Sequence, residues 1–216
     1  MATKKTTAVE ITIPEIKLKQ ARIRIVGTSP LVVHKFSEKA KRQMLEKQMK
    51  TAKTSAKEAK NPCEDFMGAL YWLTPMPEEF TEEAFENAIK NGARFGFPTT
   101  GIKASIVSAA YRSDLVKNKV SLFGMFHIMG EFAEIKGAAP FMREDMVRLS
   151  TGVADIRYRP EFSTGWYMDL EITYNSSMLS LEQLMSFITL GGFSVGLGEC
   201  RIEKGGQWGS YKVAAK

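Results

Sequence analysis

The residues best suited to chemistry on a charged polymer lie in the last quarter of the chain. Glycines punctuate residues 191–209, and basic and aromatic side chains stand among and beside them: Arg201, Lys204, Trp208 and Tyr211. Glycine lets the backbone take positive φ and lets a ligand approach closely, while cations hold phosphates and aromatic rings stack on bases. The segment therefore favours binding of single-stranded nucleic acid. An ordinary hairpin with bulges is the alternative interpretation.

A second signal is the concentration of positive charge between residues 35 and 60. This stretch holds nine basic and three acidic residues, an excess that equals the net charge of +6 of the whole chain. A concentrated field steers a polyanion better than a diffuse one, although a solvated helix face has the same composition. A membrane-surface helix is disfavoured, because the apolar positions are mostly alanine. The predicted nucleic-acid contacts here are Lys35, Lys39, Arg42, Lys47, Lys50 and Lys53.

Arginines and a tyrosine form a third group at residues 143–159. Guanidinium groups among aromatic rings can hold phosphates while the rings stack on bases. The alternative is a surface loop in which Glu144, Asp145 and Asp155 pair with the arginines. Together with the glycine segment and one helix, the second set of predicted contacts is Lys103, Arg143, Arg157, Tyr158, Arg159, Arg201, Lys204 and Trp208.

His34 is the candidate for acid–base chemistry. With Lys35 beside it, a histidine could protonate a leaving 5′-oxygen while the lysine stabilises the phosphorane. No histidine, tyrosine or serine partner is identifiable nearby, so we expect no enzyme, and a partly buried or phosphate-contacting His34 is the alternative. His127, inside an apolar run, is expected to be structural. No metal site or cofactor is predicted, since the two cysteines and two histidines are not closely paired.

The chain of 216 residues suits one domain, residues 1–216, in which 36–62 form a basic helix or mobile arm. Helices are expected from Ser37 to about Met49 or beyond with Pro62 as a stop, at 82–91 after Thr81, at 102–111, and at 181–190 after Ser180. Strands are expected at 21–27, 166–174 and 211–213, with a hairpin of 122–128 and 132–135. Residues 95–101 are expected to form a loop, and 143–158 to be irregular.

This order predicts an α+β domain with an antiparallel sheet and helices on one face, as in ferredoxin-like and RNA-recognition folds, plus the inserted arm. No stretch of about 18 apolar residues predicts a membrane span. The first residues lack the apolar segment of a secretory signal, and the two cysteines, Cys63 and Cys200, form no disulfide framework. We therefore expect the protein to reside in a reducing cytoplasm.

Three segments together resemble the RAMP superfamily, the RNA-binding proteins of CRISPR effector complexes. They are the strand that leads into Ser29-Pro30-Leu31, the segment Phe97-Pro98-Thr99-Thr100-Gly101 entering a helix, and the glycine-rich loop before a terminal strand. The resemblance implies a modified RNA-recognition fold, a finger-like insertion and a backbone subunit that polymerises along guide RNA, here in a phage-encoded relative. The family often has Gly-Ser-Ser after the proline and an arginine deeper in the helix, where this chain has Val107 and Ser108.

The sequence thus predicts a protein that binds single-stranded RNA or DNA with little sequence specificity and assembles side by side into a homo-oligomeric filament. The implied surroundings are the cytoplasm, that of a bacterial host if phage-encoded, with CRISPR or phage recombination proteins as partners and no membrane. Two alternatives stay open. One is a metal-independent endoribonuclease that uses His34, and the other is a structural or assembly protein, such as a virion or tube component, whose charge is incidental.

Overall fold

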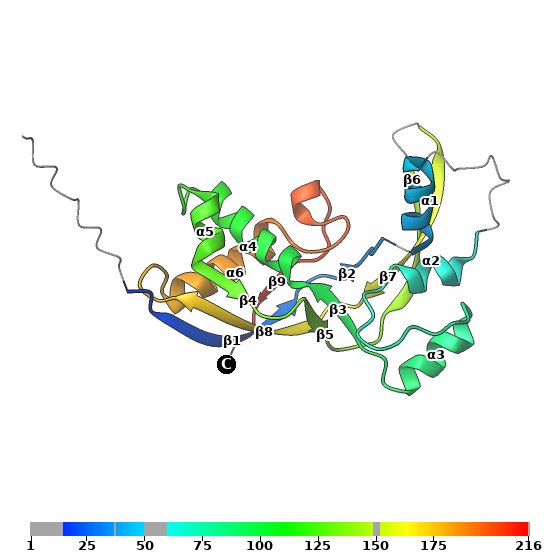
Figure 1. Ribbon diagram of the computed structural model, residues 1–216, viewed down its shortest axis with the longest axis horizontal. Helices are drawn as coiled ribbons and strands as arrows, with labels where there is room; N and C mark the ends of the chain where they lie inside the picture. The colour runs from blue at the N-terminus through cyan, green and yellow to red at the C-terminus, as the bar shows by residue number, and fades with distance from the viewer. Residues whose placement is uncertain (1–14, 37, 50–59, 149–151, 216) are drawn as a thin grey trace, which may run out of the picture.

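The computed structural model describes residues 15–36, 38–49, 60–148 and 152–215. Its helices are α1 (Glu38–Gln48), α2 (Pro62–Gly68), α3 (Glu82–Lys90), α4 (Thr99–Arg112), α5 (Lys119–Met125), α6 (Leu181–Ser194) and a 3₁₀ turn, η1 (Ile202–Lys204). Its strands are β1 (Leu18–Gly27), β2 (Leu31–Val32), β3 (Phe95–Pro98), β4 (Phe126–Ile128), β5 (Phe132–Ile135), β6 (Phe141–Arg148), β7 (Ala154–Phe162), β8 (Tyr167–Asn175) and β9 (Tyr211–Val213). The chain is an α+β protein with antiparallel sheets (Figure 1).

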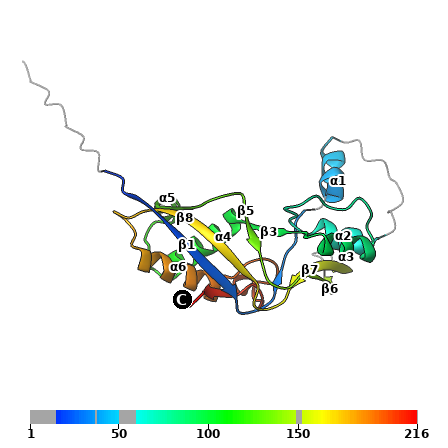
Figure 2. The same cartoon turned by 90° about the horizontal axis from the view of Figure 1, so that it is seen from below.

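The main sheet has the strand order β4-β8-β1-β9, and each neighbouring pair is antiparallel. Helices α4, α5 and α6 lie on one side of this sheet, and the view from below shows β1 and β8 uncovered in front of them (Figures 1 and 2). Period-two alternation accounts for this: Ile23 and Ile25 face the helices and are buried, whereas Arg22 and Arg24 point the other way and are exposed. The predicted strands at 21–27, 166–174 and 211–213 are confirmed.

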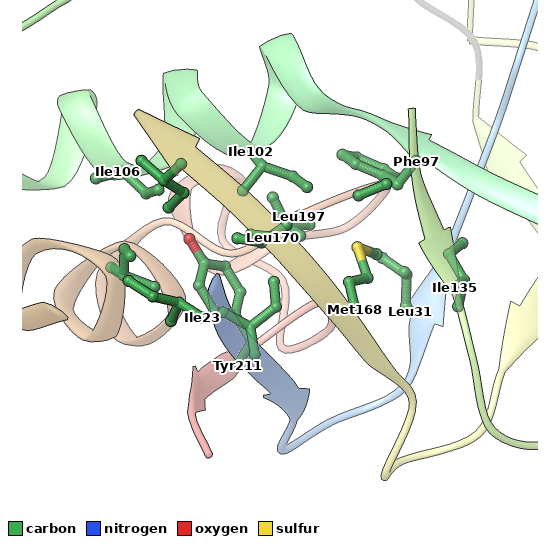
Figure 3. Close-up of a cluster of buried hydrophobic side chains, with 14 of the residues drawn as sticks. Ile23, Leu31, Phe97, Ile102, Ile106, Ile135, Met168, Leu170, Leu197 and Tyr211 are labelled. Carbon is green, nitrogen blue, oxygen red and sulfur yellow. The ribbon is translucent and has the colours of Figure 1, made fainter. Parts of the chain in front are cut away.

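The core of this layer lies between the helices and the sheet. Ile102 and Ile106 of α4 point toward β8, where Leu170 and the buried ring of Tyr211 meet them (Figure 3). Leu197, from the loop that follows α6, is 2% exposed and joins the same cluster. The loop is therefore anchored by a buried side chain rather than free to move as a whole.

The other end of the molecule is built from the sheet β2-β7-β6 and the pair β3-β5, with α1, α2 and α3 near them (Figure 1). Strands β6 and β7 form a long antiparallel hairpin, and α2 packs against β7. The prediction of an irregular segment at 143–158 is wrong. Charged residues alternate along β7, and ion pairs join its charges to those of β6, so polarity there does not indicate a loop.

The two helix caps predicted from the sequence, Thr81 and Ser180, are confirmed. The side chain of Thr81 accepts a hydrogen bond from the N–H of Ala84, and Ser180 forms a capping box with Gln183. Pro62, predicted to end the basic segment, instead opens α2 behind an Asn61 cap. Residues 50–59 lie outside the described chain, so whether α1 continues as a helix or an arm is not described.

Residues 95–101 are not a loop, and this prediction is wrong. Phe95–Pro98 form β3, which pairs with β5 and leads directly into α4. Gly96 allows close approach within this strand, since a Cβ there would lie 2.9 Å from the Cβ of Phe132. The rings of Phe95 and Phe97 are both buried.

The hairpin expected from 122–128 and 132–135 does not form either. Lys119–Met125 are helical (α5), β4 pairs with β8, and β5 pairs with β3. A short apolar run is compatible with a helix and with a strand. Here the side chain of Asn118 caps the segment by accepting hydrogen bonds from the N–H groups of Val120 and Ser121, which favours the helix.

Helix α6 runs through Gly191 and Gly192 to Ser194, beyond the stop predicted at the glycine pair. A Cβ on Gly192 would lie 1.8 Å from the carbonyl oxygen of Tyr211. These glycines therefore permit contact between α6 and β9 rather than ending the helix. Among the described residues, no helix combines the length and apolar character needed to cross a membrane.

Candidate functional site

Two of the three segments singled out in the sequence are held together by backbone hydrogen bonds. In the glycine loop (residues 195–210), the N–H of Gly209 donates to the carbonyl of Pro30 at 2.7 Å. The N–H of Glu199 donates to the carbonyl of Val32 at 2.8 Å. The turn after β1 and the short strand β2 therefore hold the glycine loop in place through these backbone hydrogen bonds.

The third segment, at the start of α4, faces the same loop across a cavity of about 280 Å³. Gly196 and Gly198 have φ of +74° and +72°, and a Cβ on Gly198 would lie 2.2 Å from the carbonyl oxygen of Val32. Glycine is therefore required for this wall of the cavity. We call this space the loop cavity; it is lined by Phe97, Gly101, Ala104, Ser105, Ser108, Val195, Gly196, Leu197, Gly198, Arg201 and Glu203.

Cations gather around the loop cavity. Glu203 accepts hydrogen bonds from Arg201, at 2.8–3.0 Å, and from Arg112 at the end of α4. Lys119 Nζ lies 3.3 Å from the hydroxyl of Ser108 on the cavity wall. Burial would raise the pKa of Glu203, but the two arginines hold that pKa below its ordinary value. Arg201 and Arg112 thus pair with one ionised carboxylate, and Lys119 adds a further positive charge at the cavity wall.

The sequence indicated Arg201 but missed Arg112, Lys119, Ser108 and Glu203. Arg112 and Lys119 belong to the end of one helix and the start of the next, and nothing in their local pattern marks them. Only the return of the chain after α6 brings Glu203 beside Arg112.

A contact between the hairpin and the glycine loop joins two of the predicted binding groups. The guanidinium carbon of Arg143 lies 3.9 Å from the centroid of the Trp208 ring. Arg143 also pairs with Asp145 at 2.8 Å and with Glu161 at 2.7 Å. One face of the Arg143 guanidinium therefore contacts the indole ring, and its N–H groups pair with the two carboxylates.

Arg159 does not offer its charge at the surface, although it was predicted as a contact. Its exposure is 4%, and its Nη1 lies 3.6 Å from Asp145. In the described part of the chain, Arg159 Nε and Asp145 Oδ2 are buried without a hydrogen bond. Arg159 belongs to the internal charge network of the hairpin, because burying a cation requires a paired anion.

Other predicted contacts lie on or beside the hairpin. Arg157 pairs with Asp155 at 3.6 Å, and Lys60 lies 5.9 Å from the ring centroid of Tyr158. The acids expected to blunt this patch therefore do pair with its arginines. Lys204 is exposed in η1.

The basic segment is described only in part. The amide of Lys35 donates to the carbonyl of Ala69, and Arg42 lies 4.0 Å from Glu46 on α1. Lys39 and Lys47 belong to α1, but their side chains lie outside the described structure, as do Lys50 and Lys53 entirely.

Lys103 points away from the loop cavity. Its ammonium lies 5.4 Å from the Phe126 centroid and 3.3 Å from Nδ1 of His127. Burial lowers the pKa of Lys103. His127 is exposed on β4 rather than enclosed in an apolar strand as predicted.

His34 has a partner that the sequence could not reveal. Its Nδ1 lies 3.6 Å from Oε1 of Glu199 in the glycine loop, and both side chains are partly exposed. The neighbouring His34 side chain holds the pKa of Glu199 below its ordinary value, against the effect of partial burial. Burial, with the charge of Glu199, raises the pKa of nearby Tyr71. A carboxylate can orient an imidazole, so this pair deserves a test.

Cys63 and Cys200 are both free thiols. Within the described ranges, no group of three or more His, Cys, Asp or Glu residues is placed to hold a metal ion. No protein-family model matches this chain, and no curated protein is significantly similar to it.

Proposed function

We propose that the protein binds single-stranded nucleic acid with little sequence specificity and assembles side by side along the strand. The observation that carries this proposal is that the start of α4 and the glycine loop line the loop cavity, while the turn at Pro30 holds the glycine loop through backbone hydrogen bonds. Arg201 and Glu203 line that cavity, Arg112 pairs with Glu203, and Lys119 contacts Ser108 on the cavity wall. Cations beside a glycine-lined groove suit a phosphate chain.

The path of the chain supports a ferredoxin-like fold. Elements β1-α4-β4-β8-α6-β9 follow the βαββαβ order, and their sheet order is β4-β8-β1-β9 with α4 and α6 on one face. In this interpretation the segment between β1 and α4 and the β6–β7 hairpin are insertions that extend from one end of the domain. This arrangement is the one implied by the resemblance to the RAMP superfamily.

Low sequence specificity follows from the kind of groups available. Exposed cations of α1, including Lys41 and Arg42, can neutralise phosphates, and Trp208 and Tyr158 offer rings. Phosphate contacts carry no sequence information, and stacking accepts any base. Side-by-side assembly would multiply these weak contacts along one strand.

Charge reversal in the basic segment tests the proposal. In one variant, Lys35, Lys39, Arg42 and Lys47 are changed to Glu; in the control, Lys17, Lys19, Lys90 and Lys212 are changed, so that the net charge is equal. Each phosphate contact contributes about 0.7 to the slope of log affinity against log salt for single strands. We expect the first variant to lose binding and the control to retain most of it. Equal losses of affinity in the two variants would mean that the basic segment contributes only its net charge and makes no particular phosphate contacts.

A second candidate function is favoured by the pair of His34 and Glu199. The carboxylate would hold the Nδ1 side of the ring, leaving Nε2 for proton transfer to a 5′-oxygen during RNA cleavage without a metal. Purified protein is incubated with RNA in a chelator. RNA cleavage that disappears in His34→Ala supports an endoribonuclease. A wild type that does not cleave RNA, or a His34→Ala variant that cleaves it as fast as the wild type, contradicts this candidate function.

A further inference from the structure

Helices α4 and α5 and the edge strand β4 pack together and bring a lysine and a histidine into contact (Figure 1). The Nζ of Lys103 lies 3.3 Å from Nδ1 of His127, at an exposed position of β4. An ammonium can only donate hydrogen bonds, so this contact requires that Nδ1 be unprotonated and accept. On the neighbouring strand β8, Thr173 lies opposite His127, and Glu171 and Tyr174 are the titratable residues nearest to Thr173 along that strand. Lys103 and His127 thus combine a nucleophile with a group that can take its proton.

Two aromatic rings border the Lys103 ammonium. It lies 5.8 Å from the ring centroid of Phe123 on α5 and 5.4 Å from that of Phe126 on β4. Rings attract a cation, but they also displace the water that solvates it. The net effect of burial lowers the pKa of Lys103. A lysine with a lowered pKa holds more of the neutral, nucleophilic amine near neutral pH.

No negative charge on the three elements opposes the neutral form. Helices α4 and α5 and strand β4 contain neither aspartate nor glutamate, and among the described residues no carboxylate forms an ion pair with Lys103. The other cations of these elements are engaged elsewhere, Arg112 with Glu203 and Lys119 with Ser108. Lys103 therefore differs from the lysines of this chain that pair with acids, since a paired carboxylate favours the ammonium.

We propose that Lys103 is an acylation site, whose amine takes an acyl group from a small activated donor, either an acyl phosphate or an acyl thioester. The ammonium gives one proton to Nδ1 of His127, and the resulting amine attacks the carbonyl carbon of the donor. A C–N bond forms, the C–O bond to phosphate or the C–S bond to thiol breaks, and the leaving group departs with the electron pair. The nitrogen then gives a further proton to the leaving group, and His127 returns its proton to water. The product is a neutral amide, so the reaction removes one positive charge, and it requires no bound nucleic acid.

The test compares lysines within one folded protein. Purified protein is treated near neutral pH with acetyl phosphate or, separately, with acetyl-coenzyme A, and peptide mass spectrometry gives the initial rate at each lysine. Lys90 is the internal control, because it lies on α3 and pairs with Glu86 at 3.7 Å. His127→Gln removes the proton acceptor, and His34→Gln is the matched control because it changes the other histidine of the chain. Thermal melting confirms that both variants fold.

We expect Lys103 to react at least about threefold faster than Lys90, since each unit by which a pKa falls gives about tenfold more neutral amine. This ratio should fall in His127→Gln, stay unchanged in His34→Gln and disappear in urea. In the wild type, the rate at Lys103 should also level off at a lower pH than the rate at Lys90. Reaction with only one of the two donors supports the inference and identifies the donor class. A Lys103 that reacts no faster than Lys90 with either donor would overturn it, and so would an unchanged ratio in His127→Gln.

Discussion

Arg143 lies with its guanidinium 3.9 Å from the ring centroid of Trp208, and this contact ties the β6–β7 hairpin to the glycine loop. The two residues come from segments that the sequence predicted separately as binding groups. Their contact means that each is already engaged within the protein. Any strand that stacks on Trp208 must therefore share the ring with Arg143 or use its other face.

The Arg143–Trp208 pair should show measurable coupling. A double-mutant cycle of Arg143→Met and Trp208→Ala, followed by urea unfolding, should give a coupling energy of about 0.5–2 kcal/mol for a cation over an indole. Arg143→Met alone should be the more destabilising change, since it also removes the partner of Asp145 and Glu161. Strict additivity of the two changes would mean that the contact contributes nothing to stability.

Two helical glycines should respond oppositely to alanine. A Cβ on Gly192 in α6 would lie 1.8 Å from the Tyr211 carbonyl oxygen, so Gly192→Ala should lower the free energy of unfolding by about 1–3 kcal/mol or more. Gly124 in α5 has nothing within 4 Å of its added Cβ, and alanine there should stabilise the protein by up to about 1 kcal/mol. Chemical denaturation of both variants checks this, and a harmless Gly192→Ala would contradict the close approach of α6 to β9.

Stability should fall in acid through Asp169 on the uncovered face of the sheet. The hydrogen bond from Arg24, at 2.8 Å, holds the pKa of Asp169 below its ordinary value against the effect of burial, and Lys136 acts in the same direction. A carboxyl with a lowered pKa in the folded state stabilises the fold above its unfolded pKa of about 3.9. This contribution is lost as the pH falls through the folded value.

Asp169→Asn should therefore lower the free energy of unfolding at pH 7 by on the order of 1 kcal/mol and flatten its decline in acid. Glu79→Gln, at an exposed position before α3, is the control and should follow the wild type. Unfolding by urea from neutral pH to below the unfolded pKa measures both curves. If the free energy of unfolding falls equally in acid for Asp169→Asn and the wild type, the ion pair of Asp169 and Arg24 is not the cause of the acid sensitivity.

Two lysines near α4 should differ in their effect on nucleic-acid binding. Lys119 reaches the loop cavity through Ser108, whereas Lys103 lies over Phe126 and points away. Lys119→Gln should reduce the slope of log affinity against log salt by about 0.7, the value of one phosphate contact on a single strand. Lys103→Gln should leave the slope unchanged. The reverse result would support the sequence-based prediction of Lys103 and move the strand to the other side of α4.

The elements that could be predicted are those whose signals are local. Strand β8 follows from the alternation of Met168, Leu170 and Ile172, all buried on one face, and the Ser180 cap marks the start of α6. Glycine misled the prediction at Gly192, because there it allows α6 and β9 to approach closely instead of ending the helix. Local pattern cannot separate these two uses of glycine.

The candidate site was predictable in its glycine loop and in Arg201, but not as an assembled cavity. Glu203 meets Arg112, and His34 meets Glu199, only because the chain after α6 returns to the end of α4 and to the turn that follows β1. Such pairings depend on tertiary structure and leave no mark in the local sequence. The hairpin was missed for a related reason, since its charged residues satisfy one another across and along the strands.

The most direct test of the central claim is purification of the protein at low and at high salt, followed by the 260/280 nm absorbance ratio. Any nucleic acid is extracted and treated with nucleases specific for RNA or DNA. We predict nuclease-sensitive particles at low salt that carry RNA or single-stranded DNA and dissociate as salt rises. A clean protein that also fails to bind added oligonucleotides at about 50 mM salt, where phosphate contacts are strong, would contradict the account and favour an assembly protein.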